Sequence, residues 1–357
     1  RIAFGAAGFV AAAIAAIARM APAPLEFPAM TADPFLDSPD ASGDTSQSPG
    51  RGRRWLRRIK WATLLLLLVI ILYYPVGMIL VHRINDDPGF APASVPQGGS
   101  KAVAVAAALI QREVVDSPWP ANDPFFLPGA ALDNMPNFQI GIQEALRRFA
   151  TEMADQIGRA RGSSSADTDL TDARGALNYA PDRWVWDPSV SLWPTAGSED
   201  QYKAAMRSLL NYNNRLSRGQ ASFEPRADNL MTTLDRIGKD LGAASNAIDQ
   251  QIDEHSGDWI DWQADDKFYR TKGELYAFGL LLRDMGTDFQ AVIQEKGATT
   301  VWQRMVSSML EGASLQPLVV MNGSPNALLQ PNHLAAQGFY LLRARTQLEE
   351  ITDILQK

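Results

Sequence analysis

One stretch of this 357-residue chain gathers the side-chain types that bind cations or transfer protons. A single histidine lies there among six carboxylates, with two tryptophans between them. The stretch comprises Asp253, Glu254, His255, Asp258, Trp259, Asp261, Trp262, Asp265 and Asp266. Carboxylate oxygens together with an imidazole nitrogen can hold a divalent cation, so His255, Asp258 and Asp261 are the candidate metal ligands.

The same stretch allows two other interpretations. Trp259 and Trp262 are candidate binding residues, since an aromatic face beside carboxylates can stack on an apolar ring face. A pair such as Asp258 and Asp261 could act as acid and base on a glycosidic bond. The alternative is a solvated acidic helix end whose tryptophans pack on neighbouring helices, because no spacing here matches a known metal loop.

A second candidate is the aromatic segment, residues 178–194, which contains three tryptophans, a tyrosine and three prolines. Trp184 and Trp186 are its candidate binding residues, in an exposed recognition patch. The other interpretation is a rigid cover over the apolar end of a helical bundle. Tyr212 and Asn214 add polar groups near the end of a later helix, with the same two interpretations.

The rest of the chain offers little chemistry. Phosphate-binding loops, nucleophile elbows and zinc-protease motifs are missing from the sequence. The chain has no cysteine, which excludes a thiol nucleophile, thiolate metal ligands and disulfides. We therefore expect no cofactor. Of the other histidines, His82 is expected at a membrane surface and His333 at a helix start.

The elements that must position these residues begin with an apolar run from Trp61 to Val81. Twenty-one helical residues at about 1.5 Å each cross roughly 30 Å of hydrocarbon, so we expect a transmembrane helix over 61–82. A collar of basic residues precedes the run, consisting of Arg53, Arg54, Arg57, Arg58 and Lys60. Because basic residues stay on the cytoplasmic side, we expect a cytoplasmic N-terminus, and the lipid bilayer is the first partner.

The N-terminal region has its own expectations. Residues 30–60 carry many Pro, Ser and Asp and too few apolar residues to fold, so they predict a disordered cytoplasmic tail. Residues 1–29 are expected to be upstream sequence or a disordered extension, with translation starting at Met30. A signal peptide and a second spanning helix are the alternatives considered for that stretch.

After the apolar run, residues 83–99 are rich in Pro and Gly and predict an extended linker. Residues 100–357 form the domain, and apolar stripes at helical spacing predict seven helices. These are expected at about 101–115, 137–160, 198–217, 230–252, 275–292, 302–309 and 332–357. Ser100 and Asn332 are expected as N-caps, and Ser198 with Gln201 as a capping box. One β-rich run, 318–321, cannot make a sheet alone.

The predicted fold class is therefore all-α: a single N-terminal transmembrane helix followed by an antiparallel bundle of six or seven helices with long loops. After residue 82 the chain has 35 acidic and 25 basic residues. That balance argues against nucleic acid as a partner, because phosphate binding needs a basic surface. Oligomeric state is not indicated by the sequence.

Four short sequence motifs resemble those of a proteobacterial family of membrane-anchored proteins, domain of unknown function 2333. They are Trp184-Val185-Trp186-Asp187-Pro188, residues 210–216 (Leu-Asn-Tyr-Asn-Asn-Arg-Leu), residues 271–276 (Thr-Lys-Gly-Glu-Leu-Tyr) and residues 330–334 (Gln-Pro-Asn-His-Leu). The resemblance covers about residue 55 to the end. It implies a Gram-negative inner membrane, and it assigns no catalytic or binding residue.

The leading functional hypothesis is a non-enzymatic protein of the bacterial inner membrane. Its periplasmic domain would be an accessory or scaffold subunit of an envelope complex, with a protein partner in the cell envelope. One alternative is a periplasmic enzyme that acts on glycan or peptidoglycan through paired carboxylates. Another is a ligand-sensing helical domain, which would need a separate signalling partner because the cytoplasmic tail is short.

Overall fold

The structure, a computed structural model, describes residues 51–158, 166–186, 191–258, 261–324, 327 and 330–357. Within these residues it contains ten α-helices and a few short 3-10 and π turns. Their only β interaction is an isolated antiparallel bridge between Asn322 and Asn332. The predicted all-α class is therefore confirmed, and the β-rich run at 318–321 forms no strand.

The chain divides into two compact units, residues 1–71 and residues 72–357. The described part of the first unit is the beginning of helix α2, Arg51–Val81, which continues into the second unit. The stretch Trp55–Val81 is long and apolar enough to cross a membrane, and none of its most apolar window is buried. Pro75 lies inside the helix without ending it, because the helical assignment runs on to Val81.

The second unit contains the remaining nine α-helices. They are α3 (Lys101–Ile110), α4 (Asn134–Glu152), α5 (Thr168–Leu177), α6 (Ser198–Ser217), α7 (Ala227–His255), α8 (Trp262–Asp288), α9 (Gln290–Glu295), α10 (Thr299–Ala313) and α11 (His333–Gln356). Shorter turns extend α3 and α4, namely η1 (Gln111–Asp116) and η4 (Met153–Ile157), and two more lie between these helices, η2 (Pro120–Asn122) and η3 (Pro128–Ala131). All seven predicted helices are present, and the short α5 and α9 are additional.

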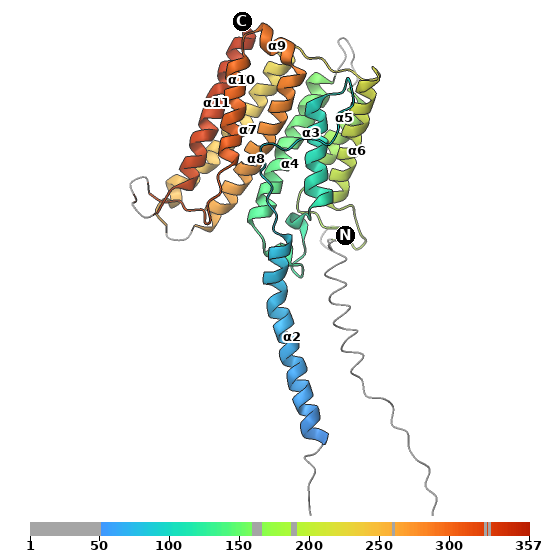
Figure 1. The fold of residues 1–357 in the computed structure, drawn as a ribbon, viewed down its shortest axis with the longest axis vertical. Coiled ribbons are helices and arrows are strands. Elements are labelled where there is room, and N and C mark those ends of the chain that lie inside the picture. The colour runs from blue at the N-terminus through green and yellow to red at the C-terminus, as the bar shows by residue number, and fades with distance from the viewer. Residues whose placement is uncertain (1–50, 159–165, 187–190, 259–260, 325–326, 328–329) are drawn as a thin grey trace, which may run out of the picture. The chain divides into compact units, whose positions relative to one another are not determined.

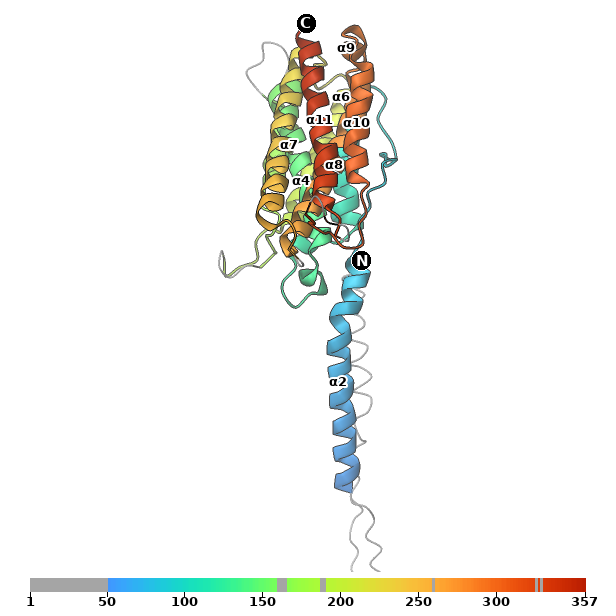
Figure 2. The same ribbon diagram turned by 90° about the vertical axis from the view of Figure 1, so that its left-hand side faces the viewer.

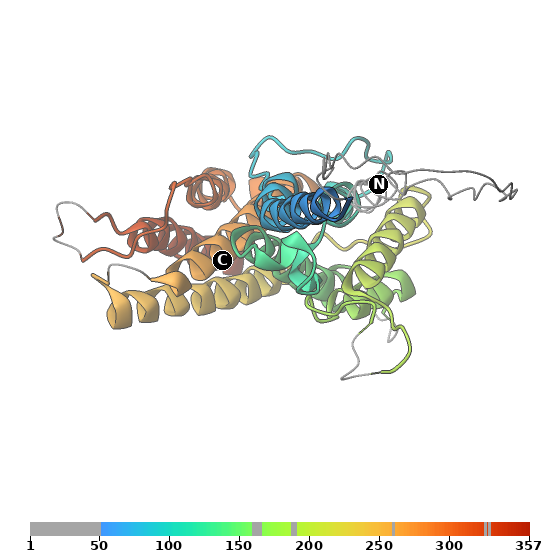
Figure 3. The ribbon, with the colours of Figure 1, turned by 90° about the horizontal axis from the view of Figure 1, so that it is seen from below.

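Helices α4 and α8 form the centre of this unit (Figure 3). α3, α5 and α6 pack on one side of the pair, and α7, α10 and α11 pack on the other. Most sequence neighbours run antiparallel, as expected, but α4 and α8 run in the same direction. Asn137 contacts Asp266 near the start of both helices, and Glu144 contacts Arg270 further along both.

Two glycines let the central helices approach closely. A Cβ atom on Gly273 of α8 would lie 2.0 Å from the backbone oxygen of Phe138. One on Gly141 of α4 would lie 2.1 Å from the backbone oxygen of Arg270. Any other residue type would separate the helices, because backbone atoms cannot rotate away as side chains do.

Two of the three helix caps predicted from the sequence are present in the structure. The Ser100 hydroxyl accepts from the Val103 amide at 3.1 Å, and the Asn332 side chain accepts from the Ala335 amide at 2.7 Å. The predicted capping box at Ser198 does not form, because the Ser198 hydroxyl instead donates to backbone oxygens of the preceding loop. That contact ties the start of α6 to the aromatic segment.

Four connections meet at one end of the unit, which we call the loop end (Figures 1 and 2). They are the described parts of residues 117–133, 178–197, 256–261 and 314–332, and they join α3 to α4, α5 to α6, α7 to α8 and α10 to α11. The first two touch each other, since the Trp119 indole donates to the Pro181 oxygen at 2.9 Å. The last two also touch, through the Gly257 amide and the Asn322 oxygen at 2.8 Å.

Residues 83–99, expected to be an extended linker, contain no helix and are bound along the second unit. The Asp86 carboxylate pairs with the ammonium group of Lys272 at 2.7 Å, and Lys272 is only 1% exposed. The Tyr276 hydroxyl donates to the Asp87 oxygen at 2.8 Å, and the Arg283 guanidinium donates to the Phe90 oxygen at 2.8 Å. The stretch is thus attached to α8 rather than free in solvent.

Candidate functional site

The aromatic segment is held at its base and exposed at its tip. Asn122 donates to the Arg183 oxygen at 2.9 Å, which fixes the backbone just before Trp184. Trp184 is half-buried, and its ring packs edge-on against Phe126 with centroids 5.8 Å apart. Trp186 is exposed, as is Trp193 further along the same connection. Trp184 is therefore partly covered by another connection, Trp186 and Trp193 are exposed, and a binding role for the segment stays a prediction.

The acidic stretch around His255 runs from the last turn of α7 through the connection into the first turns of α8. His255 Nδ1 lies 3.2 Å from the Asp258 carboxylate, and both side chains are exposed. Asp261 instead caps α8, accepting from the Ala264 amide at 3.1 Å and from Asn322 at 3.1 Å. Trp262 is exposed, and Trp259 lies outside the described residues.

A metal centre at His255 stays a prediction. Across the ranges that the structure describes, no three His, Cys, Asp or Glu side chains come together in a way that could hold an ion. Two of the candidate ligands, His255 and Asp258, are adjacent, whereas the oxygens of the third, Asp261, are used by backbone and amide donors. Asp265 lies at the start of α8, where burial and the nearby Asp133 raise its pKa to about 6.

The polar candidates on α6 divide between a structural and an exposed position. Tyr212 is buried, its hydroxyl donates to the Ser222 oxygen at 2.6 Å, and burial raises the pKa of the phenol. Asn214 is exposed to solvent. The neighbouring Asn213, not singled out from sequence, is buried and bonds both backbone groups of Ser100, at 2.7 Å and 3.0 Å. The motif at residues 210–216 therefore fixes the start of α3 through Asn213.

A set of charged groups that the sequence analysis missed lines a pocket of about 280 Å³ between α4, α7 and α8. Arg270 donates to Glu144 at 2.9 Å across the central helix pair. Burial and the adjacent Glu144 carboxylate raise the pKa of Glu274 well above its usual range. A carboxyl group that is kept protonated in this way can act as a general acid. The residues that line the pocket come from three helices, so no spacing within a short stretch of sequence predicts it.

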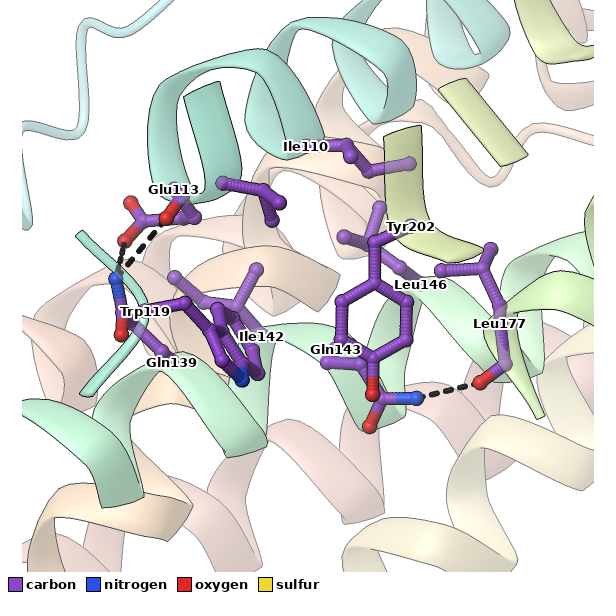
Figure 4. Close-up of a pocket in the computed structure, with 10 residues that line it drawn as sticks. Ile110, Glu113, Trp119, Gln139, Ile142, Gln143, Leu146, Leu177 and Tyr202 are labelled. Atoms are coloured by element: carbon purple, nitrogen blue, oxygen red, sulfur yellow. Dashed lines mark hydrogen bonds between the residues drawn. The ribbon is translucent and has the colours of Figure 1, made fainter. Parts of the chain in front are cut away.

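A second, smaller cavity of about 10 Å³ lies between α3, α4, α5 and α6 (Figure 4). Trp119 and Tyr202 border it, and Gln139 donates to the Glu113 carboxylate at 3.1 Å beside it. The volume is about that of one water probe, so this is a packing gap in the core and not a ligand site.

The basic collar lies in the first turns of α2. Arg57, Arg58 and Lys60 are exposed there. Arg53 and Arg54 belong to the same helix, but their side chains lie outside the described set. Fold and surface together define a class: a helical domain preceded by one helix that is apolar enough to span a membrane.

The chain belongs to a family described as an uncharacterized protein conserved in bacteria, DUF2333. The family model matches residues 97–261 and 249–357, which together cover the helical domain and most of the chain. This confirms the family inferred from the four sequence motifs, although the match begins at residue 97 and not at about residue 55. No curated protein and no solved structure matches the chain.

Proposed function

We propose that the protein is a single-pass inner-membrane protein of Gram-negative bacteria, with its tail in the cytoplasm and its helical domain in the periplasm. The observation that carries this proposal is α2, whose apolar side chains are exposed along the stretch Trp55–Val81. Burying this surface in lipid removes the cost of leaving it in water. Arg57, Arg58 and Lys60 at the beginning of the stretch support the cytoplasmic position of the N-terminus.

Topology can be measured directly because the chain has no cysteine. We would place single cysteines at Ser46 in the tail and at Gln294, an exposed residue between α8 and α10. A membrane-impermeant maleimide applied to cells with a permeabilised outer membrane should label Gln294→Cys and spare Ser46→Cys until the inner membrane is broken. Labelling of Ser46→Cys alone in intact cells would reverse the proposed orientation.

Within the envelope, we propose an accessory or scaffold role in a protein complex. Several polar candidates from the sequence have structural roles, as the bonds of Asp261 and Tyr212 indicate, which favours binding over catalysis. Helix α11 offers a partner surface, since Phe339 and Leu342 are three residues apart and both exposed on one face.

The partner test compares surfaces in the full chain, purified in detergent through a C-terminal tag. The variant Phe339→Ser with Leu342→Ser should lose a stoichiometric envelope partner that the wild type retains through size exclusion. Leu210→Ser on α6 is the matched control, because Leu210 is also exposed but lies on another helix. Retention of the partner by the double variant would exclude this face, and a solitary wild-type protein would count against the scaffold role.

The pocket at Glu144 and Glu274 favours a second candidate, an enzyme that cleaves glycan or peptidoglycan. Glu274, whose pKa burial raises well above its usual range, would act as the general acid, and the hydrogen bond between its side chain and Glu144 would hold its proton in place. Purified full-length protein incubated with peptidoglycan should then release soluble fragments, and Glu274→Gln should abolish that release. Equal fragment release by wild type and Glu274→Gln would exclude this pair.

A further inference from the structure

We propose that the loop end of the helical unit lies in the interfacial layer of the same bilayer that α2 spans, with its exposed apolar side chains inserted into lipid. This inference rests on the proposed anchoring by α2 and adds a second, peripheral contact made by the domain itself. The occupant is the boundary between headgroups and hydrocarbon, where aromatic side chains are favoured.

The first argument is where the exposed apolar side chains lie. Beyond residue 82, fourteen large apolar residues are exposed among those that the structure describes, and eleven of them lie in the four loop-end connections or within two residues of them. They are Val115, Phe125, Phe126, Val185, Trp186, Leu192, Trp193, Trp262, Leu318, Val319 and Met321. The other three lie on the faces of α6 and α11. At the opposite end, the described connections 218–226 and 289–298 expose none.

The second argument is the composition of the connections. Residues 314–332 contain no charged residue, although Leu318 and Val319 are exposed within them. Residues 117–133 contain two charges, Asp123 and Asp133. Exposed apolar side chains in a segment with little or no charge can enter lipid at low cost, and contiguous exposed apolar surface marks an interaction site. Contact with the apolar part of a bilayer would explain why both connections expose apolar side chains and carry so few charges.

The third argument is a direct contact with the candidate span. The Tyr73 hydroxyl donates to the Phe126 oxygen at 3.1 Å, and the Tyr74 hydroxyl donates to the Phe125 oxygen. Both tyrosines belong to the stretch Trp55–Val81, which is apolar enough to cross a membrane. The connection bonded to them therefore adjoins residues that we propose to lie in the bilayer.

The bonding of this connection also suits lipid. A backbone oxygen has no partner in hydrocarbon, and the two tyrosine hydroxyls supply one for Phe125 and one for Phe126. The helix and the connection are also in direct contact, because a Cβ atom on Gly77 would lie 2.4 Å from Cγ of Pro128. Phe125 itself is 84% exposed, so it is free to enter lipid.

Charge indicates which part of the bilayer is contacted. The four connections contain one basic residue, Arg183, and several acidic ones. Attraction to anionic headgroups depends on clustered Lys and Arg, so it contributes little here. The contact is therefore apolar, and it should form on phosphatidylcholine as well as on bilayers that contain phosphatidylglycerol.

The test uses the full chain reconstituted into phosphatidylcholine nanodiscs. Single cysteines at Phe125, Trp193 and Leu318 are labelled with an environment-sensitive fluorophore, and quenching by lipids that carry a spin label is measured. These side chains are exposed, so their replacement should leave the fold intact, which circular dichroism checks. Leu66→Cys in the span reports insertion of α2, and Gln294→Cys reports the opposite end of the unit.

We expect strong quenching at Leu66→Cys and at all three loop-end positions, a blue-shifted emission at those positions, and no quenching at Gln294→Cys. Quenching at Leu66→Cys with none at the loop end would overturn this inference and leave the anchoring intact. No quenching at Leu66→Cys would overturn the anchoring and this inference with it. Loop-end quenching that appears only with phosphatidylglycerol would overturn the apolar contact.

Discussion

Replacing Gly273 by alanine should destabilise the protein, although alanine is the better helix former. A Cβ atom at this position would lie 2.0 Å from the Phe138 oxygen, whereas carbon and oxygen normally approach to about 3.3 Å. The contacted atom is backbone, so α4 and α8 must separate by more than about 1 Å to relieve the clash.

The magnitude follows from two opposing effects. Inserting a methylene into a packed site costs about 1–3 kcal/mol, and a rigid backbone neighbour places Gly273→Ala at the upper end. The higher helix propensity of alanine stabilises the folded state by about 1 kcal/mol and offsets part of this cost. The net loss is about 2 kcal/mol, and at roughly 2–4 °C per kcal/mol for a unit of this size it lowers Tm by about 4–8 °C.

Thermal unfolding in detergent, followed by circular dichroism, measures this change. Gly238→Ala is the matched control, since Gly238 lies within α7 and a Cβ atom there would contact nothing within 4 Å. It should raise Tm by about 2–4 °C through propensity alone. If Gly273→Ala were as stable as Gly238→Ala, the close approach of α4 and α8 would be refuted.

Three further predictions address buried and half-buried charged groups. Lys272→Met leaves Asp86 without its ion partner and should lower the free energy of unfolding, measured with denaturant, by about 3 kcal/mol. The double variant with Asp86→Asn should regain part of that loss, because it no longer holds an unpaired charge. Asp288→Ala removes the acceptor for the first amides of α3 and should cost about 1–2 kcal/mol in the same assay. Burial and Asp133 raise the pKa of Asp265 from 3.8 to about 6. Between these values the folded state binds more protons than the unfolded state, so the free energy of unfolding should fall as the pH rises from 3.8 to 6. Asp265→Asn should flatten that slope in unfolding curves recorded across this range, and an unchanged slope would contradict the assignment.

The helices could be predicted because their burial is periodic. The stripe on α7, including Leu230, Leu234 and Ile237, is buried as its spacing indicates. Helix α5 was missed because it has only ten residues, with three of them buried (Leu170, Ala173 and Leu177), and it follows a stretch typical of a loop. Helix α9 was merged with α8, since the apolar stripe continues across the break at Phe289.

Contacts between distant parts of the chain could not be predicted in this way. The pairs Lys272 with Asp86 and Glu144 with Arg270 join residues more than one hundred positions apart. A glycine inside a helix, such as Gly273, indicates only weak helix propensity until its neighbour is known. Composition did indicate the aromatic segment, but whether Trp184 or Trp186 is covered depends on Phe126, which belongs to another connection.

The attachment of residues 72–99 to the helical unit makes a lipid contact at the loop end energetically accessible. Tyr73 and Tyr74 bond the connection at 125–126, and Lys272 and Arg283 hold the stretch that follows α2. A free domain would lose several kcal/mol of translational and rotational freedom on binding a membrane, but a domain bonded to its own anchor has already lost most of it. Each exposed aromatic side chain that enters lipid then contributes at about 25 cal/mol per Å². Weakening the attachment with Gly77→Val, which forces Pro128 away from α2, should therefore reduce quenching at the loop end while leaving Leu66 in the bilayer.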